Sequence, residues 1–311
     1  MINNGYNGWV FIDKPIGASS NYILQKVRKI FSNIKAGYVG TLDPLASGFL
    51  PIALGSATKT IKFIEGSYKE YIFEVKWGES STTGDSEGEL KEKTKIIPNE
   101  NEIRETIDNF IGVYHQRPPI FSSKKINGLR AYRLAKKKIS FELKKERKKI
   151  YDLKIINLVS NAKASFFVKC SSGTYVRSLA EDIAKSLKTY GVITSLRRVG
   201  FGNFDKKLIS LDYLLSLVHI EDLLGVVKPL NLVFNEFNQI CLDENEVNHI
   251  LNGRPVKLKN GLVNDNNLYK GYTFAKFKDV VIAVGYLKDK SFYPKNLLNN
   301  FLSERNQNNV K

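Results

Sequence analysis

The chain carries one stretch that decides its interpretation, GYVGTLDPLASGFLP at residues 37–51. Two glycines and a proline within Gly37–Pro44 predict a tight loop. Gly37 and Gly40 allow the backbone to approach a ligand closely. Asp43 is the candidate functional carboxylate of this loop, although an Asp before a Pro is also an ordinary turn residue. The stretch by itself therefore leaves the role of Asp43 open.

Apolar periodicity on both sides of this loop predicts alternating strands and helices. Residues 9–12 form a short apolar run closed by Asp13-Lys14-Pro15, which predicts a strand and a turn. Helical spacing predicts helices over residues 21–31, capped by Ser19 or Ser20, and over residues 103–111. Alternation over Tyr71–Trp77 predicts a half-buried strand. Tyr71 lies near the start of this strand, a position from which its side chain can point into a cleft.

The middle of the chain is strongly basic. Residues 124–149 contain 12 Lys or Arg residues against Glu142 and Glu146. Strands are expected over residues 150–159 and 164–170, a helix over 175–187 and a strand over 196–199. Arg177 falls at the expected strand-to-helix junction, where loops commonly carry function. Its alternative is an ordinary surface Arg. The large unit of mixed helices and strands ends near residue 232.

The composition changes after Pro229 and predicts a second unit. Residues 234–238 are polar enough to serve as a linker. The following module, about 238–302, is expected to be small and β-rich. It has a short helix over residues 244–251 and strands over 272–277 and 280–286. The tail, residues 303–311, is polar and expected to be frayed.

The charge and the cysteines restrict the class of protein. The 311 residues carry a formal net charge of +17, which favours a polyanionic partner because Lys and Arg displace counterions from phosphates. A nucleotide bias in the coding sequence is the alternative explanation for the many Lys residues. No long apolar run or secretory signal is present, and two cysteines are typical of a reducing cytosol.

Cofactor and metal chemistry finds no support in the sequence. The three His residues are far apart and form no ligand spacing with Cys170 or Cys241. No Gly-rich loop ends in Lys-Ser or Lys-Thr, and no Gly-x-Ser-x-Gly elbow occurs. We therefore expect no cofactor and no metal ion.

The stretch 37–51 resembles the catalytic loop of the TruB-type pseudouridine synthases. Five further segments resemble parts of that family in the same order, so that the similarity spans about residues 9–204. They are Val10–Ser20 (the Lys-Pro loop), Lys69–Tyr71 (the strand bearing the active-site Tyr), Gln116–Pro119 with Ser122 and Lys125 (before the RNA-gripping insertion), Ser172–Arg177 (the active-site Arg) and Leu196–Arg198 (the last core strand).

The resemblance implies an α/β (α+β) fold. It predicts a pseudouridine synthase catalytic domain over residues 1–232 with a mixed, mainly antiparallel sheet and a basic RNA-gripping insertion at about 120–150. Residues 252–256 and 271–286 resemble the PUA-like module of bacterial members less specifically. This module, at 238–302, is expected to meet the acceptor-stem side of tRNA.

The resemblance also implies the roles of the site residues. Asp43 is the catalytic carboxylate, Arg177 pairs with it, and Tyr71 stacks on the target base and relays the proton that leaves C5. An adjacent cation lowers the pKa of an Asp, so Arg177 is expected to keep Asp43 ionised. Lys14 supports the loop or meets phosphate, and Leu196 forms an apolar wall. Substrate-binding roles fall on Tyr38, Lys14, Gly40, Tyr175, Leu196, Lys125, Lys136 and Lys137.

The loop departs from the family pattern at two positions. The family usually has His-Thr where this chain has Tyr38 and Val39. A Tyr ring retains a π-face for stacking on extruded bases, whereas Val39 keeps the branched shape of Thr without its hydroxyl. Ser123 replaces the usual Ala. The departures concern base extrusion, and the carboxylate of Asp43 is retained.

The expected activity is isomerisation of uridine to pseudouridine in the T-loop of tRNA, at position 55. The expected partner is the tRNA T-arm, with no membrane and no obligate protein partner, in the cytoplasm. One alternative is the guide-RNA-dependent relative that modifies ribosomal RNA, which usually carries extra protein-binding extensions. Another is an RNA-folding chaperone without catalysis, against which Asp43, Tyr71 and Arg177 together argue.

Overall fold

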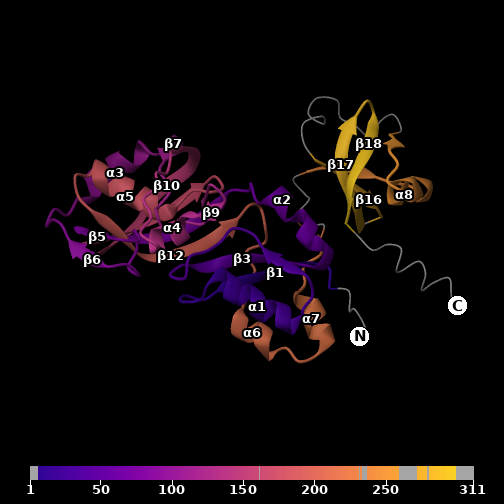
Figure 1. Cartoon of the computed structure of the whole chain (residues 1–311), viewed down its shortest axis with the longest axis horizontal. Coiled ribbons are helices and arrows are strands. Elements are labelled where there is room, and N and C mark those ends of the chain that lie inside the picture. Colours follow the sequence, from indigo (N-terminus) through magenta and orange to yellow (C-terminus); the bar gives the residue numbers. More distant parts are fainter. Residues whose placement is uncertain are drawn as a thin grey trace.

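A large mixed sheet organises the first two thirds of the chain (Figure 1). The computed structural model describes residues 6–160, 162–230, 232, 237–258, 272–278 and 280–298. Among these, nine strands form one sheet in the order β13-β1-β3-β12-β4-β11-β10-β7, with β2 paired to β3. They are β1 (Gly8–Lys14), β2 (Ala36–Tyr38), β3 (Ser47–Leu54), β4 (Lys69–Trp77), β7 (Gly112–Gln116), β10 (Glu146–Ser160), β11 (Lys163–Cys170), β12 (Gly191–Phe201) and β13 (Ile209–Ser210).

The sheet consists of two mainly antiparallel halves joined by a short parallel seam between β3 and β12. All its pairings are antiparallel except β1–β13 and β3–β12, which confirms the mixed, mainly antiparallel sheet expected from the sequence. The β3–β12 seam has two register pairs, Ser47 with Arg197 and Gly48 with Arg198. A Cβ atom on Gly48 would lie 2.2 Å from the carbonyl oxygen of Arg198, so only glycine fits there.

Helices cover the inner face of the β4–β11–β12 half. The helices α3 (Glu100–Asp108) and α5 (Val176–Ser186) bury apolar residues against Phe73, Val75 and Phe166. The helix α3 begins three residues before the predicted start at Ile103, because Asn99 and Glu102 form a reciprocal capping box. The helix α1 (Ser20–Ile30) covers the other half and is capped by Ser19, one of the two predicted caps.

Short elements complete the large unit. The 3-10 helix η1 (Gly55–Thr60) leads into α2 (Ile61–Ile64), and α6 (Leu211–Ser216) and α7 (Ile220–Val226) follow the sheet. The polar segment 78–89 contains β5 (Glu79–Ser81), which pairs with β6 (Leu90–Glu92).

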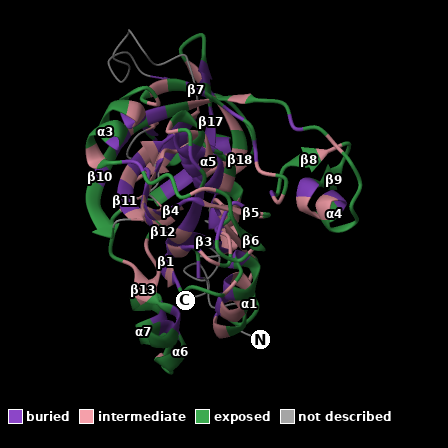
Figure 2. Ribbon diagram, turned by 90° about the vertical axis from the view of Figure 1, so that its left-hand side faces the viewer, coloured by how far each residue is buried: buried purple, intermediate pink, exposed green. Residues whose placement is uncertain are grey.

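Residues 120–145 form a projection that we call the insertion lobe. It contains the hairpin β8 (Lys125–Ile126) and β9 (Leu129–Arg130), followed by α4 (Ala131–Lys136). Figure 2 shows this lobe standing apart from the body of the molecule, at the right. The basic stretch extends beyond it, because residues 146–149 already belong to β10 and pair with β7.

A second, separate sheet carries the C-terminal unit, as predicted. Its strand order is β14-β16-β17-β18-β15, and α8 (Glu244–Leu251) has the predicted bounds. The strands are β14 (Asn238–Cys241), β15 (Val256–Lys257), β16 (Thr273–Phe277), β17 (Val280–Lys288) and β18 (Ser291–Leu297). Phe63 of α2 meets Tyr272 and Phe274 at ring-centroid distances of 4.5 and 5.5 Å. The predicted tail lies outside the described residues, as does most of the predicted linker.

Candidate active site

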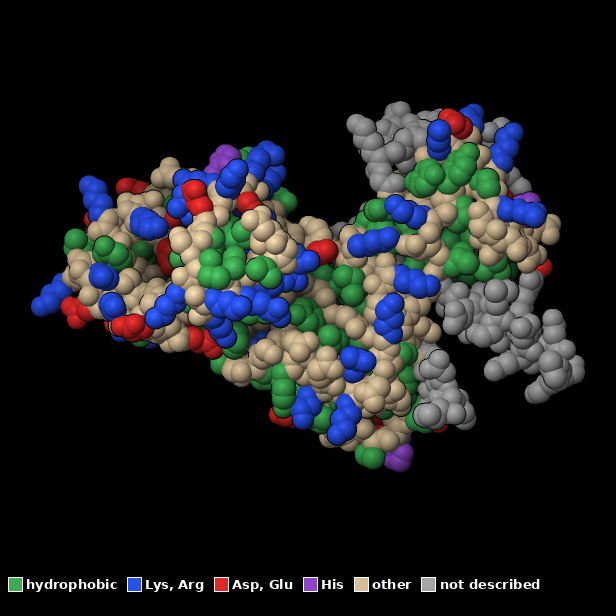
Figure 3. Space-filling view, viewed as in Figure 1, with side chains coloured by type: hydrophobic (Ala, Val, Ile, Leu, Met, Phe, Trp, Pro, Cys, Tyr) green, Lys and Arg blue, Asp and Glu red, His purple; other side chains and the backbone are tan. Residues whose placement is uncertain are grey.

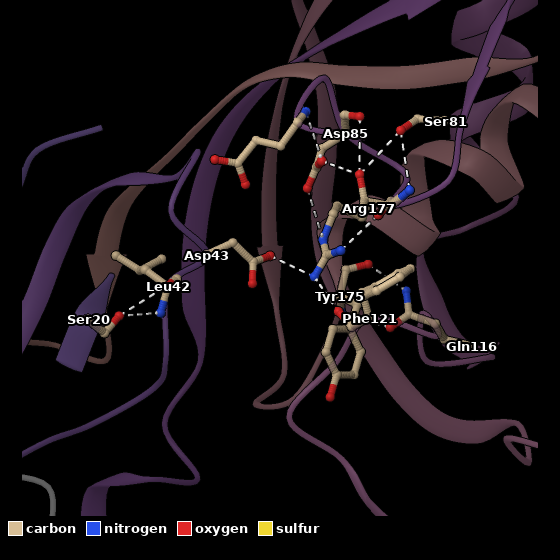
Figure 4. Close-up of polar contacts among 11 residues, drawn as sticks. Ser20, Leu42, Asp43, Ser81, Asp85, Gln116, Phe121, Tyr175 and Arg177 are labelled. Carbon is tan, nitrogen blue, oxygen red and sulfur yellow. Dashed lines mark hydrogen bonds and ion pairs between the residues drawn. The ribbon is translucent and has the colours of Figure 1, made fainter. Parts of the chain in front are cut away.

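The loop that carries Asp43 is held at several backbone atoms. Gly40 has a φ of +69°, a conformation that favours glycine. The hydroxyl of Ser20 accepts a hydrogen bond from the backbone N–H of Leu42 and donates to its carbonyl oxygen, both at 2.9 Å. These contacts fix the segment immediately before Asp43 (Figure 4).

Lys14 supports the other side of the loop. Its ammonium group donates to the carbonyl oxygens of Ala18 at 2.6 Å, Pro15 at 3.0 Å and Pro44 at 3.3 Å. The side chain is fully buried, and burial lowers the pKa of Lys14 to about 8. Of the two expected roles, this geometry matches support of the loop, since phosphate cannot reach a buried ammonium group.

Asp43 forms an ion pair with Arg177, the pairing that the family resemblance implied. The distance between Arg177 Nη2 and Asp43 Oδ2 is 2.8 Å. Arg177 is 5% exposed and also donates to the carbonyl oxygens of Thr83 at 2.8 Å and Phe121 at 3.0 Å. A guanidinium held at several acceptors keeps one orientation, so the Asp43 carboxylate is held on the cavity side.

Asp85 is a second carboxylate at Arg177, and the sequence analysis did not single it out. Its Oδ2 atom lies 3.6 Å from Arg177 Nε. Asp85 is 2% exposed and accepts hydrogen bonds from the hydroxyl of Thr83 and the backbone N–H of Glu87. The guanidinium therefore lies between a buried carboxylate and the half-exposed Asp43 (Figure 4).

The pKa of Asp43 differs from the expectation: it is raised, although a neighbouring cation was expected to lower it. Arg177 and Lys14 lower the pKa of Asp43, as predicted for neighbouring cations. Burial is the larger effect, however, and together with Asp85 it raises the pKa of Asp43 above its ordinary value. The carboxylate is therefore more basic than a free Asp, which suits a group that attacks carbon or takes up a proton.

A cavity of about 490 Å³ opens beside Asp43. It brings together six of the predicted site residues besides Asp43. These are Tyr38, Gly40, Tyr71, Tyr175, Arg177 and Leu196. Tyr71 comes from β4 and Leu196 from β12, whereas the side chain of Gln116 holds the backbone N–H and carbonyl of Tyr175 at 2.7 and 2.9 Å. The cavity thus lies across the seam between the two halves of the sheet.

The two departures from the family loop occupy different places. Tyr38 is half-buried and lines the cavity, where a ring can contact a ligand. Val39 is 1% exposed and packs in the core beside Phe49 and Phe201. The branched side chain at this position therefore lies in apolar packing, and Val39 is not among the residues that line the cavity. Ser123 lines the cavity.

The predicted basic contacts lie outside the cavity. Lys125, Lys136 and Lys137 are exposed on the insertion lobe. The lobe reaches the cavity with other residues, namely Phe121, Ser122, Ser123 and Tyr132. Figure 3 shows Lys and Arg side chains spread over both units on the face in view, which fits a polyanionic partner larger than the cavity.

Lys69 also lines the cavity. The sequence analysis named it only as part of the Lys69–Tyr71 segment and assigned it no role. Its ammonium group donates to the carbonyl oxygens of Glu65 and Ser67 at 2.7 and 2.6 Å and to the hydroxyl of Ser172 at 2.9 Å. Burial, with the nearby Arg198 guanidinium, lowers the pKa of Lys69 to about 7. Lys69 therefore ties the start of β4 to the segment that precedes Arg177.

Within the described residues, no group of three or more His, Cys, Asp or Glu side chains is arranged to hold a metal ion. None of the described helices has the length and apolar character needed to cross a bilayer.

Comparison with known proteins decides the family. The profile of the TruB family pseudouridylate synthase N-terminal domain matches residues 28–176. The chain is 41% identical over 257 residues to tRNA pseudouridine synthase B of Ehrlichia ruminantium (strain Gardel), with 81% of this chain and 87% of the relative covered. The chain belongs to the TruB family of pseudouridine synthases. The relative from Ehrlichia chaffeensis (strain ATCC CRL-10679 / Arkansas), of the same name, is 36% identical and covers 94% of this chain and 99% of its own length.

Solved structures confirm the fold of this TruB family member. The crystal structure of a Cbf5-Nop10-Gar1 complex matches with a TM-score of 0.71 at 22% identity and covers 94% of this chain and 85% of that chain. An H/ACA RNP bound to a substrate RNA matches with a TM-score of 0.69 at 20% identity and covers 94% and 86%. The pseudouridine synthase fold expected from the sequence is therefore present.

Proposed function

We propose that this TruB family enzyme isomerises uridine to pseudouridine in the T-loop of tRNA, at position 55. One observation carries the proposal. The Asp43 carboxylate, with a side chain 39% exposed, lies at the cavity and is held by Arg177 at 2.8 Å. A carboxylate fixed by a buried guanidinium at the wall of a cavity is suited to act on one extruded base.

The cavity residues divide the work of the reaction. A uridine in a folded loop has to be extruded before Asp43 can reach it. Asp43 then serves as nucleophile or base while the glycosidic bond breaks and the base rejoins the ribose through C5. Tyr71 stacks on the base and Leu196 forms an apolar wall. No group is added to the substrate, so the isomerisation needs no cofactor.

The rest of the chain holds the RNA. In this proposal Lys125, Lys136 and Lys137 of the insertion lobe contact phosphates of the T-arm. The PUA-like C-terminal unit meets the acceptor-stem side of the same tRNA. We also propose a cytoplasmic site of action without an obligate protein partner, and both cysteines in the described residues are free.

The similarities favour tRNA over the guide-RNA alternative. Curated relatives named tRNA pseudouridine synthase B reach 41% identity over 81% of this chain. The matching chain in the structure of a Cbf5-Nop10-Gar1 complex is 22% identical and supports the fold alone. An RNA chaperone without catalysis would not explain why a buried guanidinium holds the Asp43 carboxylate at the cavity.

Mapping pseudouridine in RNA treated with the purified protein tests the proposal. We expect one new pseudouridine, at position 55 of an unmodified tRNA transcript, and none with the Asp43→Asn variant. Ribosomal RNA fragments serve as the competing substrate. Modification of ribosomal RNA that requires a guide RNA would establish the guide-RNA-dependent alternative. Refolding of tRNA without any pseudouridine would establish the chaperone alternative.

A further inference from the structure

The root of the insertion lobe lies against the helix that carries Arg177. The chain leaves β7 to enter the lobe and returns from it at the start of β10, and Gln116 and Glu146 are directly opposite each other at these two ends. Gln116 is fully buried, although its side chain is polar. A buried polar group has to find its hydrogen-bond partners within the protein, so the partners of Gln116 show what it holds.

Both partners of Gln116 are backbone atoms of Tyr175, the residue directly before α5 (Figure 4). Gln116 Oε1 accepts a hydrogen bond from the Tyr175 N–H at 2.7 Å, and Nε2 donates to the Tyr175 carbonyl oxygen at 2.9 Å. Tyr175 is the N-cap residue of α5 and makes no capping hydrogen bond with its own side chain. The amide of Gln116 therefore fixes the start of α5 from a neighbouring strand.

Arg177 is the second residue of α5, so the place of its guanidinium depends on this first turn. Nη2 of Arg177 lies 2.8 Å from Asp43 Oδ2 and 3.0 Å from the carbonyl oxygen of Phe121, which belongs to the insertion lobe. One nitrogen atom therefore joins the carboxylate to the lobe. Because Gln116 fastens the lobe root to the start of α5, the backbones of Phe121 and Arg177 keep a fixed separation.

We propose that Gln116 is a positioning residue, which keeps the Arg177 guanidinium at Asp43 by fixing the first turn of α5 to the root of the insertion lobe. This inference rests on the proposed function and adds a residue to its machinery. Gln116 does not line the cavity, so it acts through Tyr175 and Arg177. When the first turn shifts, Nη2 moves away from Asp43 and the carboxylate is less firmly oriented for the reaction.

A purely structural role of Gln116 would have a different signature. Loss of stability alone reduces the folded fraction, and the rate then falls without a change in the ionisation of Asp43. Displacement of Arg177 does change that ionisation. Arg177 lowers the pKa of Asp43, so a guanidinium held less closely leaves this pKa higher and moves the acid limb of the rate profile to higher pH.

Two variants remove the contacts of Gln116 in steps. Gln116→Met has a similar length and removes both hydrogen bonds, whereas Gln116→Glu keeps the acceptor for the Tyr175 N–H and loses the donor to its carbonyl oxygen. His115 supplies the matched control, because it is exposed at the adjacent position of β7, on the opposite face of the strand. His115→Met therefore alters β7 without touching α5.

The test measures single-turnover rates from pH 4 upward and tRNA affinity for each variant. We expect Gln116→Met to slow the reaction by roughly fivefold to a hundredfold, the equivalent of two neutral hydrogen bonds, with tRNA affinity unchanged and the acid limb at higher pH. Gln116→Glu should change the same quantities less, and His115→Met should match the wild type. An acid limb of Gln116→Met at the wild-type pH would overturn the proposal.

Carbon-13 NMR of the Asp43 carboxyl group, assigned by its loss in Asp43→Asn, measures the same ionisation without a substrate. The carboxyl group should titrate at higher pH in Gln116→Met than in the wild type. In an Arg177→Met background, Gln116→Met should cause no further shift, and an equal shift in both backgrounds would overturn the proposal. Thermal melting shows whether Gln116→Met folds, and Gln116→Glu carries the test if it does not. A wild-type protein that forms no pseudouridine would refute the proposed function, whereas the NMR titration would still decide the role of Gln116.

Discussion

Arg177 reaches Asp43 across the seam of the sheet, with Nη2 at 2.8 Å from Oδ2. Asp43 precedes β3 in one half and Arg177 lies in the first turn of α5, which covers the other. Backbone carbonyls of Thr83 and Phe121 hold the guanidinium in place without a substrate. The electrostatic environment of the carboxylate is therefore preorganised, which saves reorganisation during the reaction.

Asp43→Asn should abolish isomerisation and leave tRNA binding largely intact. Asn retains the shape of the side chain and loses the charge that the chemistry needs. The expected loss of rate is roughly 10²–10⁴-fold, as for a general acid–base group. Single-turnover assays and filter binding measure the two quantities separately. Turnover above roughly one per cent of wild type would argue against Asp43 as the central residue.

The pH dependence of the rate should report the environment of Asp43. Burial raises the pKa of Asp43 above the ordinary value of an Asp, so the active carboxylate is lost as the pH falls through a value higher than that of a free Asp. Arg177 lowers this pKa, and therefore Arg177→Met should move the acid limb to still higher pH, whereas Arg177→Lys should move it less. Rate profiles from pH 4 upward would show it. An acid limb unchanged by Arg177→Met would contradict the pairing as a control of the charge.

Affinity for tRNA should fall steeply with salt, and less steeply once Lys136, Lys137 and Lys138 are changed to Ala. These residues are exposed at the end of α4 and just after it. Each lost phosphate contact should reduce the logarithmic slope by about 0.7–0.9. A matched control changes Lys91, Lys93 and Lys95, which are exposed in and after β6. Equal slopes for the two triple variants would mean that the lobe is simply a solvated surface.

Tyr38→His should be tolerated, and Tyr38→Ala should be slower. Tyr38 lines the cavity, so its ring can stack on an extruded base. Stacking contributes about 1–3 kcal/mol, which corresponds to a loss of roughly five- to 150-fold in kcat/KM on folded tRNA. The loss should shrink on unstructured RNA, where extrusion costs little. Wild-type activity of Tyr38→Ala on folded tRNA would remove Tyr38 from the extrusion step.

Lys14→Met separates the two roles expected for Lys14. Loss of its bonds to Pro15, Ala18 and Pro44 should lower the free energy of unfolding by about 1–3 kcal/mol and reduce kcat. The salt dependence of tRNA binding should stay at the wild-type slope, because the ammonium group is buried. Lys29→Met, at an exposed position of α1, is the control. A reduced salt dependence of tRNA binding in Lys14→Met, but not in Lys29→Met, would support a phosphate contact of Lys14 instead.

Local signals in the sequence were sufficient for much of the fold. The helix α8 has the predicted bounds because Asp243 and Glu246 form a capping box at its start. The basic stretch was harder to interpret, since charge says little about secondary structure. Asn127 and Gly128, both with positive φ, make the two-residue turn of the β8–β9 hairpin, and this Asn-Gly pair was the available signal.

The residues that sequence reasoning missed act through distant partners. Asp85 lies in a loop of Ser, Thr and Gly, where an Asp is indistinguishable from a turn residue. Arg198 was assigned to a strand, but nothing in its neighbourhood predicts that it binds Gly40 and Phe49. Their roles depend on the β3–β12 seam, and a single sequence contains no record of which strands become neighbours.

The seam between the two halves of the sheet also sets an order of events during synthesis. Asp43 leaves the ribosome well before Arg177, and residues 44–176 must be added in between. At about 5–20 residues per second this takes roughly 7–27 seconds. During that time the nascent chain carries the carboxylate without its guanidinium partner, and β3 lacks its neighbour β12. The Asp43–Arg177 pair and the β3–β12 seam therefore cannot form before residues 177–201 have been synthesised.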